Sequence, residues 1–166
     1  MERELRPCWG CGALVPDIEG PTHRYLGASP GCWAVYGEVL EKEYSDYRYW
    51  RAHRLTVDAY AVQHPGEPSP QTIQSAAVHL ISLYLVLEKA RSPEVAKKAM
   101  QRATTHKERF TWLEPPASTG EVRVPYVRDA ENPEEHAERA GEWARSAWEA
   151  WSDHHDTVRR WAAGSF

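Results

Sequence analysis

Four dipeptides divide this chain into helices more firmly than any other feature of its sequence. Each pairs a capping residue with a proline, and together they are Ser29-Pro30, Ser69-Pro70, Ser92-Pro93 and Asn132-Pro133. A Ser or Asn side chain accepts a hydrogen bond from a free backbone N–H of the first turn, and proline fits the first helical position because no N–H is needed there. A chain with these signals is expected to be largely helical.

The apolar periodicity that follows these signals predicts five helices. With Asp46 as a further cap, the helices cover residues 30–44, 46–64, 70–90, 93–106 and 133–163. The helix at 70–90 is apolar nearly all round, which is typical of a buried helix. A chain of 166 residues is long enough to bury a core in one domain. The predicted fold is an all-α, five-helix bundle that forms a single domain over residues 1–166.

Two segments lie outside the predicted helices. Residues 1–29 contain Gly, Pro and two of the three cysteines without a sustained period, and are predicted to form a Cys-rich, metal-binding knuckle. Residues 107–132 contain three prolines and form a long loop before the last helix, with one short strand predicted at 121–127. A loop of this length in a compact domain is usually functional or disordered, and in an enzyme it would act as a lid.

Charge and hydropathy exclude several kinds of partner. The net charge of −4 provides no basic field for nucleic acid. The longest apolar run, at residues 76–88, is too short and too interrupted to span a bilayer. No apolar segment of a secretory signal is found at the N-terminus. We therefore expect a soluble, cytoplasmic protein, in which cysteines are more often thiols or metal ligands than disulfides.

The three cysteines predict a zinc site. Cys8 and Cys11 have the Cys-x-x-Cys spacing that directs two sulfurs at one ion. Cys32 lies in the first turn of the predicted helix 30–44, where the positive helix end favours a thiolate. His23 is the predicted fourth ligand, because three Cys and one His are a common structural set. Two alternatives stay open, namely a redox-active Cys-x-x-Cys beside a buried Cys32, and three cysteines without a metal.

A second polar cluster is predicted inside the bundle. His53 and His154 lie on the apolar stripes of their helices, and His79 lies in a stripe of small polar residues on the buried helix. If helices 46–64 and 70–90 form an antiparallel hairpin, His79 lies within about one turn of Asp58 and His53. Histidines and carboxylates that point into a bundle can form metal or acid–base sites.

Four segments resemble a family of small bacterial proteins catalogued as a domain of unknown function. They are "GPTHRYLGASPGCWAVYGEVLEKEYSD", "HRLTVDAYAVQHPG", "QSAAVHLISLYLVLE" and "WARSAWEAWSDHHDTVRRW". The resemblance extends from about Cys8 to Trp161 and implies no named activity. In outline the bundle is also similar to DinB-like metal-binding four-helix proteins. Those carry two histidines one turn apart, whereas the pair here, His154-His155, is adjacent.

Two functions are consistent with these features. The first is a metal-dependent hydrolase or transferase that acts on a small molecule, with His79, His154 and His53 as ligands or general base and Asp58 as their acidic partner. The second is a zinc-stapled, non-catalytic helical module whose aromatic surface binds a partner protein or a second copy of the chain. Convergence of His79 and His154 in one pocket would favour the first.

Overall fold

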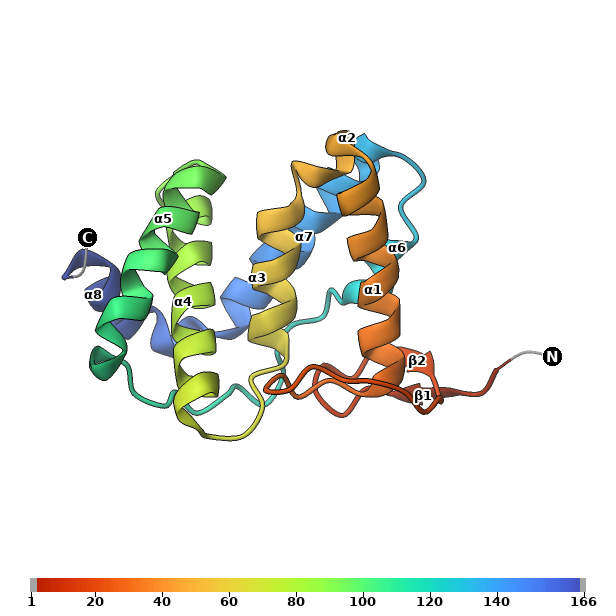
Figure 1. Ribbon diagram of the computed structural model, residues 1–166, viewed down its shortest axis with the longest axis horizontal. Coiled ribbons are helices and arrows are strands. Elements are labelled where there is room, and N and C mark those ends of the chain that lie inside the picture. Colours follow the sequence, from red (N-terminus) through yellow and green to blue (C-terminus); the bar gives the residue numbers. More distant parts are fainter. Residues whose placement is uncertain (1–2, 165–166) are drawn as a thin grey trace.

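A computed structural model describes residues 3–164, in which a short β-hairpin precedes eight α-helices (Figure 1). The elements are β1 (Leu5–Pro7), β2 (Leu14–Pro16), α1 (Pro30–Ser45), α2 (Tyr47–Trp50), α3 (His53–Gln63), α4 (Pro70–Leu87), α5 (Pro93–Ala103), α6 (Val124–Arg128), α7 (Pro133–Ala150) and α8 (His155–Ala163). The protein is mostly helical, as predicted. The prediction of an all-α fold with five helices is wrong, because the described residues contain a two-stranded sheet and three further helices.

The four predicted helix starts are confirmed. Helices α1, α4, α5 and α7 each begin at the proline of the dipeptide. The preceding Ser or Asn side chain accepts a hydrogen bond from a backbone N–H of the first turn in every case. These starts are encoded locally, which is why the sequence alone predicts them.

The predicted helix at 46–64 is divided into α2 and α3. The break lies at Arg51 and Ala52, where the hydrogen bonding of a regular helix is interrupted. The single turn of α2 buries none of its residues. It therefore has no apolar face that would hold it in line with α3, whose own residues are mostly buried.

The predicted last helix is likewise divided, into α7 and α8. A 3₁₀ turn at Ser152–His154 separates them. The His155 side chain stabilises this break, because its Nε2 donates to the Trp148 carbonyl oxygen over 2.8 Å. That carbonyl lies in the last turn of α7 and also accepts a hydrogen bond from Trp151 N–H over 3.0 Å, so both donors hold the end of the helix.

The segments outside the predicted helices are more ordered than expected. The knuckle contains the antiparallel pair β1–β2, with Arg6 opposite Val15. The short strand predicted at 121–127 is wrong, since Val124 begins the helix α6 with Pro125 in its first turn. Gln63 fixes the long loop, because its Nε2 donates to the carbonyl oxygens of Thr119 and Val122 over 3.1 and 2.8 Å. This part of the loop is anchored to α3 and is not free to act as a lid.

Helix α3 lies at the centre of the molecule, packed against α4 on one side and α7 behind it (Figure 1). The indoles of Trp143 and Trp151 are fully buried here, and Trp151 Nε1 donates to the Val62 carbonyl oxygen. Helix α1 ascends from the hairpin and α3 descends towards it, so the first turn of α1 and the last turn of α3 meet at one end (Figure 1). No helix among residues 3–164 is long and apolar enough to cross a membrane.

Candidate metal centre

The turn between β1 and β2 holds Cys8 and Cys11. Cys8 N–H donates to the Ala13 carbonyl oxygen, and Gly12 N–H donates to that of Cys8. Gly12 has a positive φ of 79°, which favours glycine at this position. The tight turn directs both cysteine side chains towards the helices, and both are buried.

Two helix ends contribute the other members of the site. Cys32 lies in the first turn of α1, where its N–H donates to the Ser29 side chain. His64 immediately follows the last turn of α3, and its carbonyl oxygen accepts a hydrogen bond from Gly27 N–H. Both side chains are fully buried. The site is therefore assembled from three segments that are distant in the sequence.

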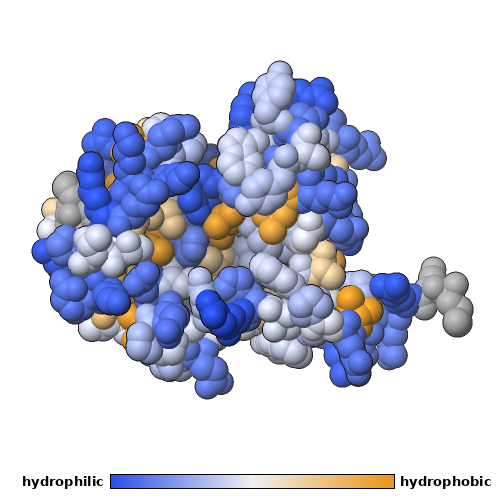
Figure 2. All heavy atoms as spheres, in the orientation of Figure 1, coloured by the Kyte–Doolittle hydropathy of each residue, from blue (hydrophilic) through white to orange (hydrophobic). Residues whose placement is uncertain are grey.

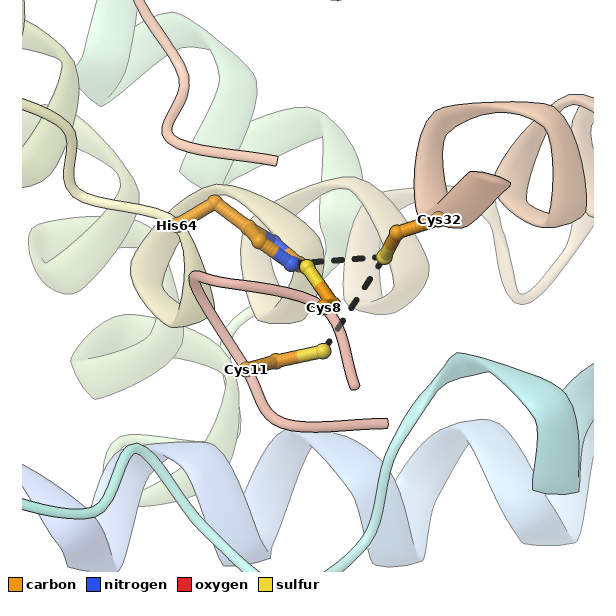
Figure 3. Close-up of side chains that lie close together, drawn as sticks. All are labelled: Cys8, Cys11, Cys32 and His64. Carbon is orange, nitrogen blue, oxygen red and sulfur yellow. Dashed lines mark hydrogen bonds between the residues drawn. The ribbon is translucent and has the colours of Figure 1, made fainter. Parts of the chain in front are cut away.

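Cys8, Cys11, Cys32 and His64 point at a common centre (Figure 3). Their ligand atoms all lie within 4.8 Å of one another, and no other group of three or more His, Cys, Asp or Glu among residues 3–164 meets this condition. The Cys11 and Cys32 sulfurs are 3.9 Å apart, and Cys32 Sγ is 3.5 Å from His64 Nε2. A tetrahedral zinc ion requires about 3.8 Å between two sulfurs and about 3.6 Å between sulfur and nitrogen. The group could hold a metal ion.

Hydrogen bonds orient the four side chains for this role. His64 Nδ1 donates to the Tyr60 carbonyl oxygen over 2.7 Å, which leaves the lone pair of Nε2 directed at the sulfurs. Cys8 Sγ accepts from Gly10 and Ser29 N–H groups over 3.4 and 3.5 Å, and Cys32 Sγ accepts from the Tyr60 hydroxyl over 3.5 Å. These donors favour thiolates over thiols.

Hydrogen bonds within the cluster shift the pKa values of its members in different directions. Hydrogen bonds from Cys11 and Cys32 hold the pKa of Cys8 well below its usual range. The pKa of Cys32 is raised, because Cys32 gives its hydrogen bonds to Cys11 and Cys8 and is buried. Burial alone would lower the pKa of His64, but its hydrogen bonds with Cys11 and Cys8 raise that pKa to about 9. A metal ion at this centre would hold all three sulfurs as thiolates and His64 as the neutral imidazole, because metal ligands must be deprotonated.

Glycine at position 10 is a condition for this geometry. A Cβ at Gly10 would lie 2.1 Å from the Gly27 carbonyl oxygen and 2.6 Å from His64 Cδ2. Both distances are far below van der Waals contact. The Cys-x-x-Cys turn can approach His64 only because this residue has no side chain.

His64 takes the place that the sequence-based prediction gave to His23. His23 is half-buried outside the group, where its Nδ1 accepts a hydrogen bond from Tyr25 N–H and its ring contacts Trp33. Sequence proximity favoured His23, since it lies between Cys11 and Cys32. The three cysteines of the prediction are brought together, and the histidine is supplied by a helix that returns to them.

The residues predicted as catalytic fall into separate contacts. His79 Nδ1 and Asp58 Oδ1 are 2.8 Å apart, so the predicted α3–α4 hairpin does align these residues. Asp58 also accepts from the Ser82 hydroxyl and from Arg54, whose Nη2 is 2.9 Å from Oδ1. This carboxylate is buried and fully used by its three neighbours.

His53 and His154 do not join that group. His53 Nδ1 lies 2.9 Å from Oε1 of the buried Glu43, and His136 Nε2 lies 2.8 Å from Oε2. His154 Nε2 donates to the Glu114 carbonyl oxygen. The expected convergence of His79 and His154 is therefore not found in their contacts. The sequence analysis does not predict the buried Glu43–His136 pair, because His136 lies among charged residues in the sequence.

Comparison with known proteins places the whole site within one family. No curated protein and no solved structure matches the chain, so the comparisons show no similarity to DinB-like proteins. A family model described as a family of unknown function (DUF5946) matches residues 6–152, which include all four members of the site. The chain belongs to this family of unknown function, DUF5946.

Proposed function

We propose that this chain is a zinc protein in which one structural ion is bound by Cys8, Cys11, Cys32 and His64. The observation that carries the proposal is the gathering of their four ligand atoms within 4.8 Å of one another, with Cys11–Cys32 and Cys32–His64 separations that match those of a tetrahedral S₃N site. Soft thiolates with one imidazole in this geometry favour zinc over the harder divalent cations. Four protein ligands, all buried, leave no open position for a substrate.

The ion would staple the N-terminal segment to the helices. The strands β1 and β2 have three residues each, and all three residues of β1 are exposed. A two-stranded hairpin of this kind is marginal in water without further support. Zinc bonds to Cys8 and Cys11 on one side and to Cys32 and His64 on the other would supply that support.

A hydrolase or transferase built on His79, Asp58, His53 and His154 has weaker support. Asp58 and His79 are paired, but His53 and His154 have other partners. The geometry therefore favours the zinc-stapled helical module, and a partner protein or second copy for that module stays a prediction.

Elemental analysis of the purified protein tests the proposal directly. We expect one zinc per chain, and intense visible absorption of a tetrahedral thiolate site after replacement of zinc by Co²⁺. His23→Ala is the matched control and should retain the full equivalent, because His23 lies outside the group. A chain that contains no metal after growth with adequate zinc, or loses it in His23→Ala, would contradict the proposal.

A more specific prediction concerns the close approach at position 10. We expect Gly10→Ala to lower zinc affinity by about 10- to 100-fold, as is usual when a supporting residue of a metal site is disturbed. The added methyl group would displace the Cys-x-x-Cys turn from His64. Competition with a chromophoric chelator measures the change. Gly37→Ala, where a Cβ meets nothing within 4 Å, should keep the affinity of the original protein.

A further inference from the structure

A cavity of about 550 Å³ lies at the opposite end of α3 from the hairpin, between the α2–α3 junction and the N-terminal part of α5. Figure 2 shows the surface hollowed between the parts of the molecule that carry α2 and α5. Its volume is within the range typical of small-molecule sites. The cavity is formed by side chains unrelated to the cysteine cluster.

His53 lines the cavity, and a contact with Glu43 on the side of its ring away from the cavity fixes its orientation. His53 Nδ1 lies 2.9 Å from Glu43 Oε1, and Glu43 is 1% exposed. Hydrogen bonds from His136, His53 and Thr56 outweigh burial and lower the pKa of Glu43, so the carboxylate is ionised. An ionised carboxylate accepts, and Nδ1 is therefore the protonated nitrogen. Nε2 has no hydrogen-bond partner among the described residues. It can therefore bind a molecule in the cavity, which His53 lines.

A carboxylate behind a histidine fixes the tautomer and the orientation of the ring, so that Nε2 presents its lone pair to the cavity. Stacking also restricts the His53 ring, because the Trp50 ring lies on it with 4.1 Å between ring centroids and 14° between planes. His53 is thus a preorganised hydrogen-bonding group on the wall of a cavity.

The remaining lining is aromatic and cationic. Trp50 and Tyr44 line the cavity and remain 46% and 67% exposed, which leaves ring surface available for stacking. Arg51 and Lys97 also line it, and neither forms an ion pair among residues 3–164. Arg54 is neutralised by Asp58, and Glu94 is the one acidic residue of the lining. The unpaired charge of the lining is therefore positive on balance.

We propose that this cavity binds a small molecule that carries both an aromatic ring and an anionic group. The ring stacks on Trp50 and Tyr44, the anionic group is held by Arg51 and Lys97, and His53 Nε2 exchanges a hydrogen bond with the ligand. The binding site is independent of the zinc proposal, because none of its residues belongs to the cysteine cluster. If the site is occupied in this way, the helical module is a receptor for an aromatic anion.

Three probes separate the parts of this proposal. Phenyl phosphate carries the ring and the anion, phenol carries the ring alone, and inorganic phosphate carries the anion alone. Each is titrated into the full chain, with its metal content measured, while backbone and indole N–H signals are followed by NMR. We expect phenyl phosphate to shift the signals of Trp50 and His53 saturably, with a dissociation constant of about 1 mM or below. Phenol and phosphate should each bind at least about tenfold more weakly.

Matched variants locate the binding. Lys97→Gln should weaken phenyl phosphate binding by up to about fivefold, whereas Lys98→Gln, an exposed neighbour on α5 outside the cavity, should not. Trp50→Leu should weaken phenyl phosphate more than inorganic phosphate. His53→Gln should weaken binding, while His79→Gln should leave it unchanged because His79 lines another cavity.

Each of several outcomes would overturn the proposal. They are the absence of saturable shifts at about 10 mM phenyl phosphate, equal affinity for phenol or inorganic phosphate, and equal losses in the Lys97 and Lys98 variants. Lys97 and Trp50 are exposed or half-exposed, so their variants are expected to fold even if His53→Gln does not.

Discussion

Replacing Cys11 by Ser is expected to abolish zinc binding at one equivalent and to lower the free energy of unfolding by at least about 3 kcal/mol. Structural zinc contributes on the order of 10 kcal/mol to the folding of small domains. A smaller loss is expected here because most residues of the buried core, Trp143 and Trp151 among them, lie outside the hairpin. The helices should persist while the N-terminal segment is released.

This effect can be separated from the cost of burying a serine hydroxyl. Denaturant unfolding of the original protein and of Cys11→Ser is measured with zinc and with excess chelator. The chelator should destabilise the original protein to nearly the level of the variant and have little effect on the variant itself. Hydrogen exchange should increase mainly in residues 3–29. Retention of a full zinc equivalent and of zinc-dependent stability in Cys11→Ser would refute the structural site.

Replacing Glu43 by Gln is expected to cost about 3–5 kcal/mol of stability, because one partner of a buried charged network is removed. The Glu43 carboxylate is fully buried and accepts from His53, His136 and the Thr56 hydroxyl. A Gln side chain presents an N–H₂ group to donors at one of these positions. Glu38→Gln, on the exposed face of the same helix and 3.5 Å from Arg128, should change stability by less than about 1 kcal/mol.

The same variant should change the dependence of stability on pH. The pKa of Glu43 is lowered in the folded protein from a usual value of 4.5, because the hydrogen bonds from His136, His53 and Thr56 outweigh burial. Its stabilising effect is therefore complete above pH 4.5 and is lost as the pH falls through the lower folded value. The difference in stability between the original protein and Glu43→Gln should narrow in acid. Urea unfolding at neutral pH and at about pH 4 measures it, and a constant difference would contradict the assignment.

Local signals account for the parts of the fold that could be predicted. A Ser or Asn cap followed by proline acts within one helical turn, and all four such starts are confirmed. The breaks at residues 51–52 and 152–154 have no comparable local signal. They depend on the lack of buried contacts in α2 and on the hydrogen bond from His155 to Trp148.

In the candidate site, too, only the residues with a local sequence signal could be predicted. The Cys-x-x-Cys pair and Cys32 were predicted from spacing, but His64 is close to Cys32 only because α1 and α3 run in opposite directions. The sequence does contain a signal for His64. Asp46 marks a turn, and the segment from Cys32 to Asp46 is similar in length to the segment from Asp46 to His64. His64, just before the helix-ending Pro65, then falls level with the first turn of α1.

The proposed zinc site also links the metal supply to the amount of folded protein. Its ligands extend from Cys8 to His64, and they meet only when α1 and α3 are packed in their native arrangement. An unfolded chain offers the ion little more than the Cys-x-x-Cys pair, so zinc binds the native state far more tightly. By mass action, each tenfold fall in free zinc then removes about 1.4 kcal/mol of stability, as long as free zinc stays well above the dissociation constant of the site. Cells short of zinc would therefore accumulate less of this protein, because its unfolded fraction is exposed to proteases.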